Sequence, residues 1–462
     1  MKPTSGLDRR TFLRSAGLTA LAGAVPAGSI LAAAPAAALA LTDLGAEPAD
    51  GRYDFDSGFD RIGTDSTKWD QQYKTYGRDH VDVGMGIADM DFKPAPCITR
   101  ALLDRIQRDN WGYLSVPDAY AESIVRWNKR RYGLEIDPKT IVNSPAVHPA
   151  IIATLRAFSP PGTKVLVPAP AYSGFYGDIR TVGCKAEDVP HKLASNGRYS
   201  LNLEELEKHI DHDTHTLILC NPQNPTGNVW SKDDLMAIGE ICLRRRVVVL
   251  ADEIHCDLVT KGNKYTPFAT LPNEAIVRNS ITFKSASKSF NLAGMKAAYM
   301  FSTNPDYLAR VRPFLRSEVS TLGLVAHQAA YTEGDAWLDQ LLVYNDANLT
   351  FVEEYIRKNI PLLKMVKPQG TYLGWVDVSV VVDKVGAKAL TDQANKDRHG
   401  AQQPLTPSHI MEKWFVDHAK VQMNPGGGFG TGGEMRMRMN CGTTRKNLEL
   451  ALSNLATALR QV

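Results

Sequence analysis

Short, unbroken apolar runs alternate with amphipathic stretches through the middle of this chain. The amphipathic stretches at residues 203–210 and 232–244 have the periodicity of helices. Apolar runs this short, and rich in β-branched residues, are typical of strands that a parallel sheet buries on both faces. The alternation therefore predicts βαβ units and an α/β fold. The runs lie at residues 164–167, 216–220, 247–251 and 280–283.

The length of 462 residues predicts two domains after any leader is set aside, because one compact core rarely grows so large. Residues 41–100 are rich in Asp, Gly and aromatic residues, and predict an N-terminal arm that includes part of a small domain. Residues 101–330 carry the alternating pattern and predict the large domain. Residues 331–462 start with a long helical pattern and then mix strands with helices, which predicts a smaller α+β domain.

Residues 1–40 have the pattern of a removable leader. Residues 9–13 read RRTFL, a twin-arginine signal, and residues 15–42 contain no charged residue. Residues 38–40 (ALA) match an A-x-A cleavage site. The alternatives are an uncleaved membrane anchor or an accidental alanine-rich helix, which Pro26 and Pro35 disfavour. We therefore expect export of the folded chain to the periplasm or the cell exterior, with no membrane attachment once the leader is removed.

The composition argues for a small-molecule substrate. Lys and Arg number 53 against 50 Asp and Glu, so the formal net charge is only +3. That charge is too small to indicate a nucleic-acid surface. The six cysteines lie far apart, without C-x-x-C or Cys/His spacing, so we expect neither a metal site nor a disulfide framework. Cys220 and Cys256 border apolar runs and are interpreted as small core residues.

Polar motifs follow three of the predicted strands, where ligands bind in open α/β sheets. Residues 221–227 (NPQNPTG) predict a rigid loop that orients the amide of Asn224. Asp252 directly follows the run at 247–251, and a carboxylate there requires a cationic partner such as a protonated pyridine nitrogen. Lys288 follows the run at 280–283 with two hydroxyl residues just before it, as a Schiff-base lysine beside a phosphate site would.

A fourth motif, Arg438-Met439-Asn440, offers a guanidinium that can grip a carboxylate through two hydrogen bonds. Taken singly, each motif has an ordinary alternative: a plain turn for residues 221–227, a helix cap for Asp252, a surface lysine for Lys288, and a surface ion pair for Arg438. Their order, with one strand–helix unit between successive motifs, favours a shared site.

The set of N-P-x-N-P-x-G, D-E-x-H, S-x-S-K and R-x-N motifs resembles the class I/II family of pyridoxal-phosphate (PLP) enzymes, over essentially the whole mature chain. That family has the aspartate-aminotransferase fold (fold type I), which implies a mostly parallel, seven-stranded large domain and a smaller α+β domain. Further motifs resemble the MalY/PatB-type cystathionine β-lyase (C–S lyase) branch. They are ADMDF at 88–92, WGY at 111–113, DEIHCD at 252–257 and GTYL at 370–373.

The resemblance implies how PLP would be held. Lys288 would bind it covalently and, once the substrate has displaced the amine, remove the Cα proton. Asp252 would pair with the pyridine nitrogen and Asn224 would donate to the ring 3-oxygen. Tyr172 would stack on the ring, with a core aromatic as the alternative. The phosphate would be bound by hydroxyl and N–H donors at a helix start, namely Ser285, Ser287 and the backbone around Val147 and His148.

The substrate contacts implied by the resemblance are Arg438 on the α-carboxylate, with Asn440 beside it, and Tyr113. Tyr113 resembles a catalytic tyrosine that reaches the cofactor of the partner subunit, which implies a homodimer with shared active sites. We expect residues 81–92 and the glycine-rich stretch 425–433 to build the side-chain pocket. That glycine-rich stretch would be a mobile loop over the site or a plain turn cluster.

Three positions depart from the family pattern or qualify it. Ala146 stands where the phosphate turn commonly has glycine, and would be strained if the position requires a positive φ. Lys296 replaces an arginine that many relatives use on the phosphate, and we expect it to supply that charge. His255 occupies the place of a tyrosine near the ring oxygen in aminotransferases, as the lyase branch does; a structural core histidine is the alternative.

The branch resemblance implies β-elimination from L-cystathionine or related cysteine S-conjugates, which yields thiol, pyruvate and ammonia. An aminotransferase is the alternative, as is another PLP reaction such as oxidation or cyclisation in a biosynthetic pathway. A non-catalytic binder of this fold would not need Lys288, and no docking tail suggests a structural protein. No second arginine can be assigned to a dicarboxylate side chain, so aspartate or glutamate specificity is not expected.

Overall fold

The computed structural model describes residues 44–396, 398 and 404–462. The predicted leader lies outside the described residues. Residues 47–462 form one compact unit, so the boundary near residue 330 stays a prediction. None of the helices in the described residues combines the length and apolar composition that a bilayer crossing requires. Nor do those residues contain a group of three or more His, Cys, Asp and Glu side chains that could hold a metal ion.

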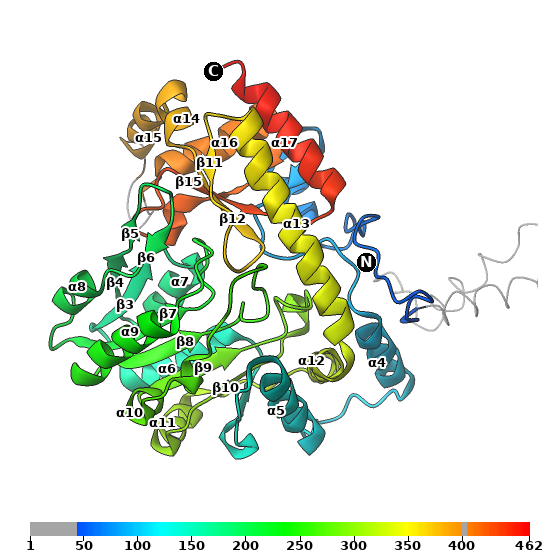
Figure 1. The fold of residues 1–462 in the computed structure, drawn as a ribbon, viewed down its shortest axis with the longest axis vertical. Coiled ribbons are helices and arrows are strands. Elements are labelled where there is room, and N and C mark those ends of the chain that lie inside the picture. Colours follow the sequence, from blue (N-terminus) through cyan, green and yellow to red (C-terminus); the bar gives the residue numbers. More distant parts are fainter. Residues whose placement is uncertain (1–43, 397, 399–403) are drawn as a thin grey trace, which may run out of the picture. The chain divides into compact units, whose positions relative to one another are not determined.

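A seven-stranded sheet forms the centre of the fold (Figure 1). Its order is β2-β10-β9-β8-β7-β3-β4, and only β10 runs antiparallel to the others. All four strands expected from the apolar runs are present, which confirms the predicted fold class. The bounds are β2 Val142–Ser144, β3 Lys164–Ala169, β4 Lys185–Pro190, β7 Thr214–Cys220, β8 Val248–Asp252, β9 Ser280–Lys284 and β10 Ala298–Phe301.

The central strands are continuous apolar runs because both of their faces are buried. On β7, Ile218 packs with α6, α7 and α11, whereas its neighbours Leu217 and Leu219 pack with α8, α9 and α10. Successive side chains of a strand point to opposite faces, so each face requires its own apolar set. The covering helices are α6 Val147–Phe158, α7 Ser173–Thr181 and α11 Pro305–Val311 on one face, and α8 Leu203–Lys208, α9 Lys232–Arg244 and α10 Glu274–Arg278 on the other.

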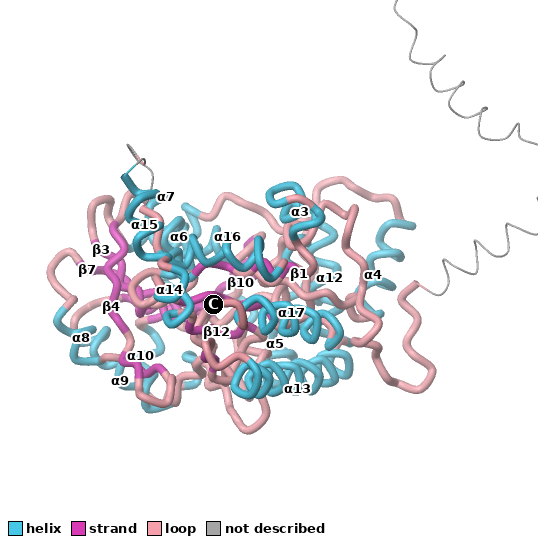
Figure 2. The backbone as a smooth tube through the Cα atoms, turned by 90° about the horizontal axis from the view of Figure 1, so that it is seen from above, coloured by secondary structure: helices cyan, strands magenta, loops and turns pink. Residues whose placement is uncertain are grey.

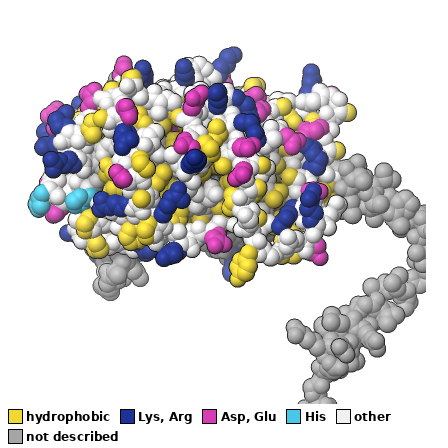
Figure 3. All heavy atoms as spheres, turned by 90° about the horizontal axis from the view of Figure 1, so that it is seen from below, with side chains coloured by type: hydrophobic (Ala, Val, Ile, Leu, Met, Phe, Trp, Pro, Cys, Tyr) yellow, Lys and Arg dark blue, Asp and Glu magenta, His cyan; other side chains and the backbone are white. Residues whose placement is uncertain are grey.

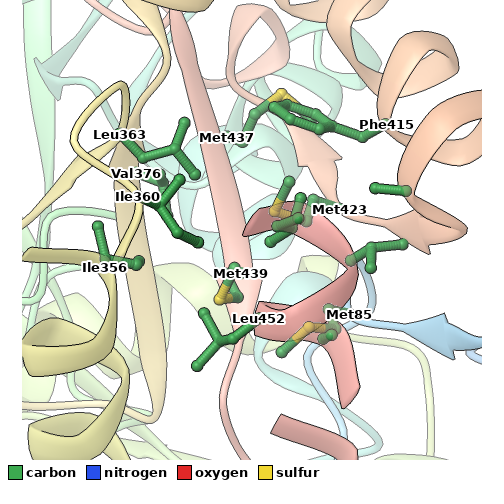
Figure 4. Packing of buried hydrophobic residues seen from close by; sticks show 14 of the residues in the cluster. Met85, Ile356, Ile360, Leu363, Val376, Phe415, Met423, Met437, Met439 and Leu452 are labelled. Atoms are coloured by element: carbon green, nitrogen blue, oxygen red, sulfur yellow. The ribbon is translucent and has the colours of Figure 1, made fainter. Parts of the chain in front are cut away.

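A second sheet, of order β11-β12-β15-β14, is built from later residues. Its bounds are β11 Lys364–Met365, β12 Leu373–Asp377, β14 Asn424–Pro425 and β15 Arg436–Asn440. One core cluster covers it and is rich in methionine, including Met423, Met437 and Met439 (Figure 4). The helices of this part are α14 Ser379–Val385, α15 Ala387–Lys396, α16 Pro407–Ala419 and α17 Arg445–Leu459.

The N-terminal arm joins both parts of the fold. Its strand β1 (Val83–Gly84) pairs in parallel with β13 (Val421–Gln422), next to the second sheet. The long helix α13 (Asp335–Asn359) contacts α12 near its start and lies beside α17 further along (Figures 1 and 2). The remaining elements are α3 Asp70–Tyr76, α4 Pro96–Gln107, α5 Asp118–Tyr132, α12 Thr321–Glu333 and the hairpin β5 Lys192–Leu193 with β6 Tyr199–Ser200.

Candidate active site

The predicted motifs meet around one cavity of about 690 Å³ at the carboxyl ends of β7, β8 and β9. Parallel strands bring their carboxyl ends to the same sheet edge, which is where α/β folds place ligands. The second sheet closes the cavity through β15, and the N-terminal arm adds its own residues. The predicted site residues that line it are Val147, His148, Tyr172, Asn224, Asp252, His255, Ser285, Ser287, Lys288, Lys296 and Arg438.

Lys288 presents its amine inside this cavity. Its Nζ donates a hydrogen bond of 2.9 Å to the carbonyl oxygen of Ala88 in the N-terminal arm. Burial, reinforced by the positive charge of Arg438, lowers the pKa of Lys288 to about 8. A lysine with such a pKa is partly neutral near physiological pH, and a neutral amine is the form that attacks a carbonyl group.

Asp252 is the last residue of β8 and is only 4% exposed. Burial raises its pKa to about 6, while the hydrogen bond from the backbone N–H of Ile254 and the nearby His148 oppose that rise. Among the described residues no side chain forms an ion pair with Asp252. A buried carboxylate without a cation is unfavourable, so the position is suited to a cationic ligand group such as a protonated ring nitrogen.

Arg438 on β15 faces the cavity from the opposite side and is 3% exposed. Its Nη1 donates to Asn224 Oδ1 at 3.2 Å and its Nη2 to the carbonyl of Gly86 at 2.9 Å, while its guanidinium lies 5.0 Å from the centre of the Phe429 ring. Burial lowers the pKa of Arg438 to about 10. Its Nε has no hydrogen-bond partner, and no carboxylate of the described chain pairs with it. A ligand carboxylate would fill that role.

The phosphate contacts implied by the resemblance lie at the start of α6 and after β9. Ser285 Oγ donates to Ala297 O at 2.6 Å and also accepts from the Ser287 N–H, which fixes the turn before Lys288. Ala146 precedes α6 with φ −160° and ψ 171°, an extended conformation that any residue adopts. The replacement of glycine by alanine is therefore unstrained here, because the position does not require a positive φ.

Two histidines border the cavity. His148 Nδ1 and Asp178 Oδ2 are 2.6 Å apart, and this hydrogen bond raises the pKa of His148. The ring of His148 lies 5.5 Å from that of Tyr172, so both aromatic groups border the same part of the cavity. His255 is fully buried, and burial together with the charges of Lys288 and Arg438 holds its pKa well below the ordinary value. Its Nδ1 lacks a partner within the described chain, and its ring is neutral.

Lys296 lines the cavity from an exposed loop after a short 3-10 helix. It has φ 62°, in the left-handed region that favours glycine. It makes no ion pair within the described residues, so its charge is available to an anion.

Three groups of residues expected at the site lie outside the cavity of the single chain. Tyr113 is fully exposed, and its expected contact with the partner subunit stays a prediction. Asn440 does not line the cavity, because its Nδ2 donates to the carbonyls of Ile87 (2.5 Å) and Asp89 (2.6 Å). In this structure Asn440 fixes the N-terminal arm, and its expected substrate contact stays a prediction. The stretch 425–433 is not part of the cavity wall either.

The glycine-rich stretch packs against the large sheet's loops. The carbonyl of Phe429 accepts from the backbone N–H of Ala171, and the N–H of Thr431 donates to Asp188. Gly426–Phe429 form a 3-10 helix. A Cβ at Gly426 would collide with the backbone of Gly433, so the glycines serve close packing. The stretch is packed in this structure, which fits the alternative of a turn cluster; the mobile loop stays a prediction.

Sequence reasoning missed one part of the wall, which the N-terminal arm supplies. Arg61, residues 64–67, and Asp89 line the cavity. Arg61 Nη2 and Asp89 Oδ2 form an ion pair of 2.7 Å. Asp89 lies within a stretch expected to form the pocket, but Arg61 had no motif around it. Its position one residue after Asp60 in an aperiodic segment offered no signal.

A match to a known protein family establishes the family of this chain. Residues 81–455 match the family described as aminotransferase class I and II. The chain belongs to this family. It is 34% identical to the cystathionine beta-lyase PatB of Bacillus subtilis, over 88% of this chain and 99% of that protein. It is 31% identical to the protein MalY of Escherichia coli, over 89% of this chain and the whole of that protein.

Solved structures agree with the family. Cystalysin from Treponema denticola, which contains pyridoxal 5'-phosphate, has a TM-score of 0.79 and 29% identity, over 89% of this chain and 99% of its own. A PLP-bound C–S lyase from Staphylococcus hominis has a TM-score of 0.77 and 28% identity, over 88% and 98%.

PLP is the cofactor, and the residues present fit it. Lys288 offers a reactive amine of lowered pKa, and Asp252 a buried carboxylate that lacks a cation. Ser285 and Ser287 lie beside the start of α6, where hydroxyl and N–H donors suit a phosphate.

Proposed function

We propose that this chain is a C–S β-lyase that cleaves L-cystathionine or a related cysteine S-conjugate to thiol, pyruvate and ammonia. The observation that carries the proposal is the similarity to the PatB cystathionine beta-lyase, which extends over 99% of that protein. Further relatives with 28–32% identity carry cystathionine beta-lyase names as well.

The side chains around the cavity suit this reaction. Arg438 would hold the substrate α-carboxylate between the two sheets, which fixes the orientation of Cα. Lys288, with a pKa of about 8, can accept the Cα proton on Nζ. When bound, PLP supplies the electron sink that makes this proton acidic, and Asp252 keeps its ring nitrogen protonated. His255, which is neutral, lies near Lys288 and Arg438 and adds no positive charge to the site.

An aminotransferase is the second candidate. The structure of a PLP-bound putative aminotransferase from Clostridium difficile has a TM-score of 0.80 and 34% identity. Lys288, Asp252, Asn224 and Arg438 would serve either reaction, because both begin with the removal of the Cα proton. The fate of the substrate therefore has to be measured.

The deciding experiment incubates the purified, PLP-loaded protein with L-cystathionine, and separately with L-alanine and 2-oxoglutarate. We expect pyruvate and homocysteine in equal amounts from the first mixture. Glutamate from the second mixture, with no thiol from the first, would assign the protein to the aminotransferases. A Lys288→Ala variant, which should form no product in either mixture, controls for contaminating enzymes.

The proposal extends to assembly and location. We propose a homodimer in which Tyr113, exposed on the single chain, reaches the cavity of the partner subunit. We also propose export by the twin-arginine route, which rests on the RRTFL sequence at residues 9–13. Replacement of Arg9 and Arg10 by lysine should retain the protein inside the cell, as cell fractionation would measure, while an equally exported variant would reject the route.

A further inference from the structure

An ion pair between Arg61 and Asp89 forms part of the cavity wall that the lyase chemistry does not use. Arg61 Nη2 lies 2.7 Å from Asp89 Oδ2, and the two side chains are 17% and 20% exposed. Both line the same cavity as Lys288. Asp89 follows Ala88, whose carbonyl accepts the hydrogen bond from Lys288 Nζ, so the pair lies next to the reactive amine.

Asp89 has one carboxylate oxygen with nothing to bind it. Oδ2 takes the ion pair, whereas Oδ1 is buried and has no hydrogen-bond partner among the described residues. The backbone there is fixed, because the carbonyl of Asp89 accepts from Asn440 Nδ2 at 2.6 Å and from Lys68 Nζ at 3.3 Å. A carboxylate oxygen held in this way, beside a cavity, is suited to a donor supplied by a ligand.

Arg61 is likewise not saturated by the protein. Its Nη1 donates to the carbonyl of Met90 at 3.1 Å and its Nη2 to Asp89. The neighbouring Asp91 has partners of its own, Lys68 Nζ at 2.6 Å and Trp69 Nε1 at 2.9 Å, and lies 3.6 Å from Arg61. A guanidinium carries five N–H donors, so the two hydrogen bonds that Arg61 makes leave capacity for an anion.

We propose that Arg61 and Asp89 form a subsite for a zwitterionic group at the far end of the substrate, with its ammonium on Asp89 and its carboxylate on Arg61. The proposal rests on the proposed lyase function and specifies its substrate class. Arg438 binds the α-carboxylate beside the reacting Cα. Arg61 and Asp89 recognise the second amino-acid group, on the far side of the sulfur. Substrates of this class are cysteine thioethers whose leaving thiol is itself an amino acid, as in L-cystathionine.

A pair of substrates isolates the contact with Asp89. L-Cystathionine and S-(3-carboxypropyl)-L-cysteine differ only in the distal amino group. The wild-type enzyme should prefer L-cystathionine in kcat/KM. In the Asp89→Asn variant, which keeps the side-chain shape, we expect this preference to fall about tenfold, chiefly through KM, because only the charge that meets the ammonium has changed.

Further experiments distinguish a substrate-binding role of Arg61 and Asp89 from a purely structural role. Asp60→Asn removes a charge from the exposed neighbour in the same arm and should leave the preference unchanged. Arg61→Lys should lower kcat/KM more for L-cystathionine than for S-ethyl-L-cysteine, which has no distal charge. Since the charge of Asp89 opposes the lowering of the Lys288 pKa, an effect of the variant on the amine would displace the pH profile for all substrates alike.

The outcomes are distinct. A preference that is absent in the wild type, or unchanged in Asp89→Asn, overturns the subsite and leaves the lyase function standing. An equal loss of kcat/KM for all substrates also overturns the subsite, and would show that Arg61 and Asp89 have a purely structural role. If the wild type releases thiol from none of the three compounds, the lyase function fails and the subsite fails with it. The wild-type comparison requires no variant, so the test stands even if Asp89→Asn folds poorly.

Discussion

Asp252 is a single carboxyl group whose burial works against the stability of the cofactor-free chain. Its pKa rises from an ordinary value of 3.8 to about 6, so the ionised form is disfavoured in the folded state. The cost is absent below about pH 4, where both folded and unfolded chains hold the proton, and is complete above about pH 6, where both have lost it. A difference of this size corresponds to about 3 kcal/mol.

We expect Asp252→Asn to raise the melting temperature of the PLP-free protein at about pH 7.5, with a much smaller gain at about pH 4. The same variant should bind PLP more weakly, because the ring nitrogen loses its counter-ion. Thermal unfolding followed by circular dichroism measures the first effect and absorbance titration the second. Asp392→Asn, at an exposed position on α15, is the control. An equal gain at both pH values would contradict the explanation by burial.

Lys296 supplies a test at the phosphate end of the cavity. Lys296→Ala should weaken PLP binding about tenfold, because a charge-assisted contact is lost, and should make binding less sensitive to salt. Equilibrium dialysis against PLP at two salt concentrations measures both effects. Lys261→Ala, an exposed lysine away from the cavity, should change neither. Unchanged PLP affinity in Lys296→Ala would reject the assignment of this charge.

Single residues show where sequence reasoning reached its limit. Lys288, Asp252 and Arg438 were predictable because each lies within a motif whose chemistry demands its residue type. The hydrogen bonds of Asn440 were not predictable, since a motif does not reveal whether an amide faces a ligand or the backbone of Ile87. Arg61 was missed because its partner Asp89 is distant in sequence and neither lies in a periodic element. The backbone angle at Ala146 could not be inferred from residue type alone.

The elements were predicted most accurately where one physical cause dominates. Strands β7, β8 and β9 begin and end within two residues of the predicted runs, because burial on both faces favours nearly continuous apolar and β-branched sequence. Strand β15 was harder to predict, because polar and apolar residues alternate along it. Met437 and Met439 enter the methionine-rich core (Figure 4). Arg438, between them in sequence, lines the cavity.

This alternation makes the core a support for the site. We expect Met437→Ala to lower the free energy of unfolding by about 3 kcal/mol, because the truncation leaves a void beneath β15. Urea denaturation measures the loss. Val343→Ala, at a side chain 72% exposed on α13, should cost close to nothing. A similar cost for both variants would show that Met437 is not part of a closely packed core.

At the scale of the whole molecule, the formal net charge of +3 is small. Basic and acidic side chains lie among one another on the face drawn in Figure 3, with hydrophobic side chains between them. The exposed Trp111 and Tyr113, 50% and 107% accessible, belong to the segment between α4 and α5. Large exposed aromatic residues of this kind suit an interface, and the proposed dimer would cover them.

The dimer can be tested by complementation. Tyr113→Ala and Lys288→Ala should each reduce activity strongly on their own. After the two variants are mixed, unfolded and refolded together, about half of the dimers are mixed, and each contains one intact site if Tyr113 serves the partner. Activity should then return to about a quarter of the wild-type value. A mixture no more active than its components would place Tyr113 in its own subunit's site or outside catalysis.

The cavity draws its walls from both ends of the sequence, and this has a consequence for the growing chain. Arg61 and Ala88 are made early, Asp252 and Lys288 midway, and Arg438 only on β15. A nascent chain that ends just after Lys288 has the amine and the carboxylate, but lacks the guanidinium that joins Asn224 to Gly86. Completion of the site therefore waits for the synthesis of β15, and a nascent chain that stops before this strand lacks the guanidinium proposed to hold the substrate carboxylate.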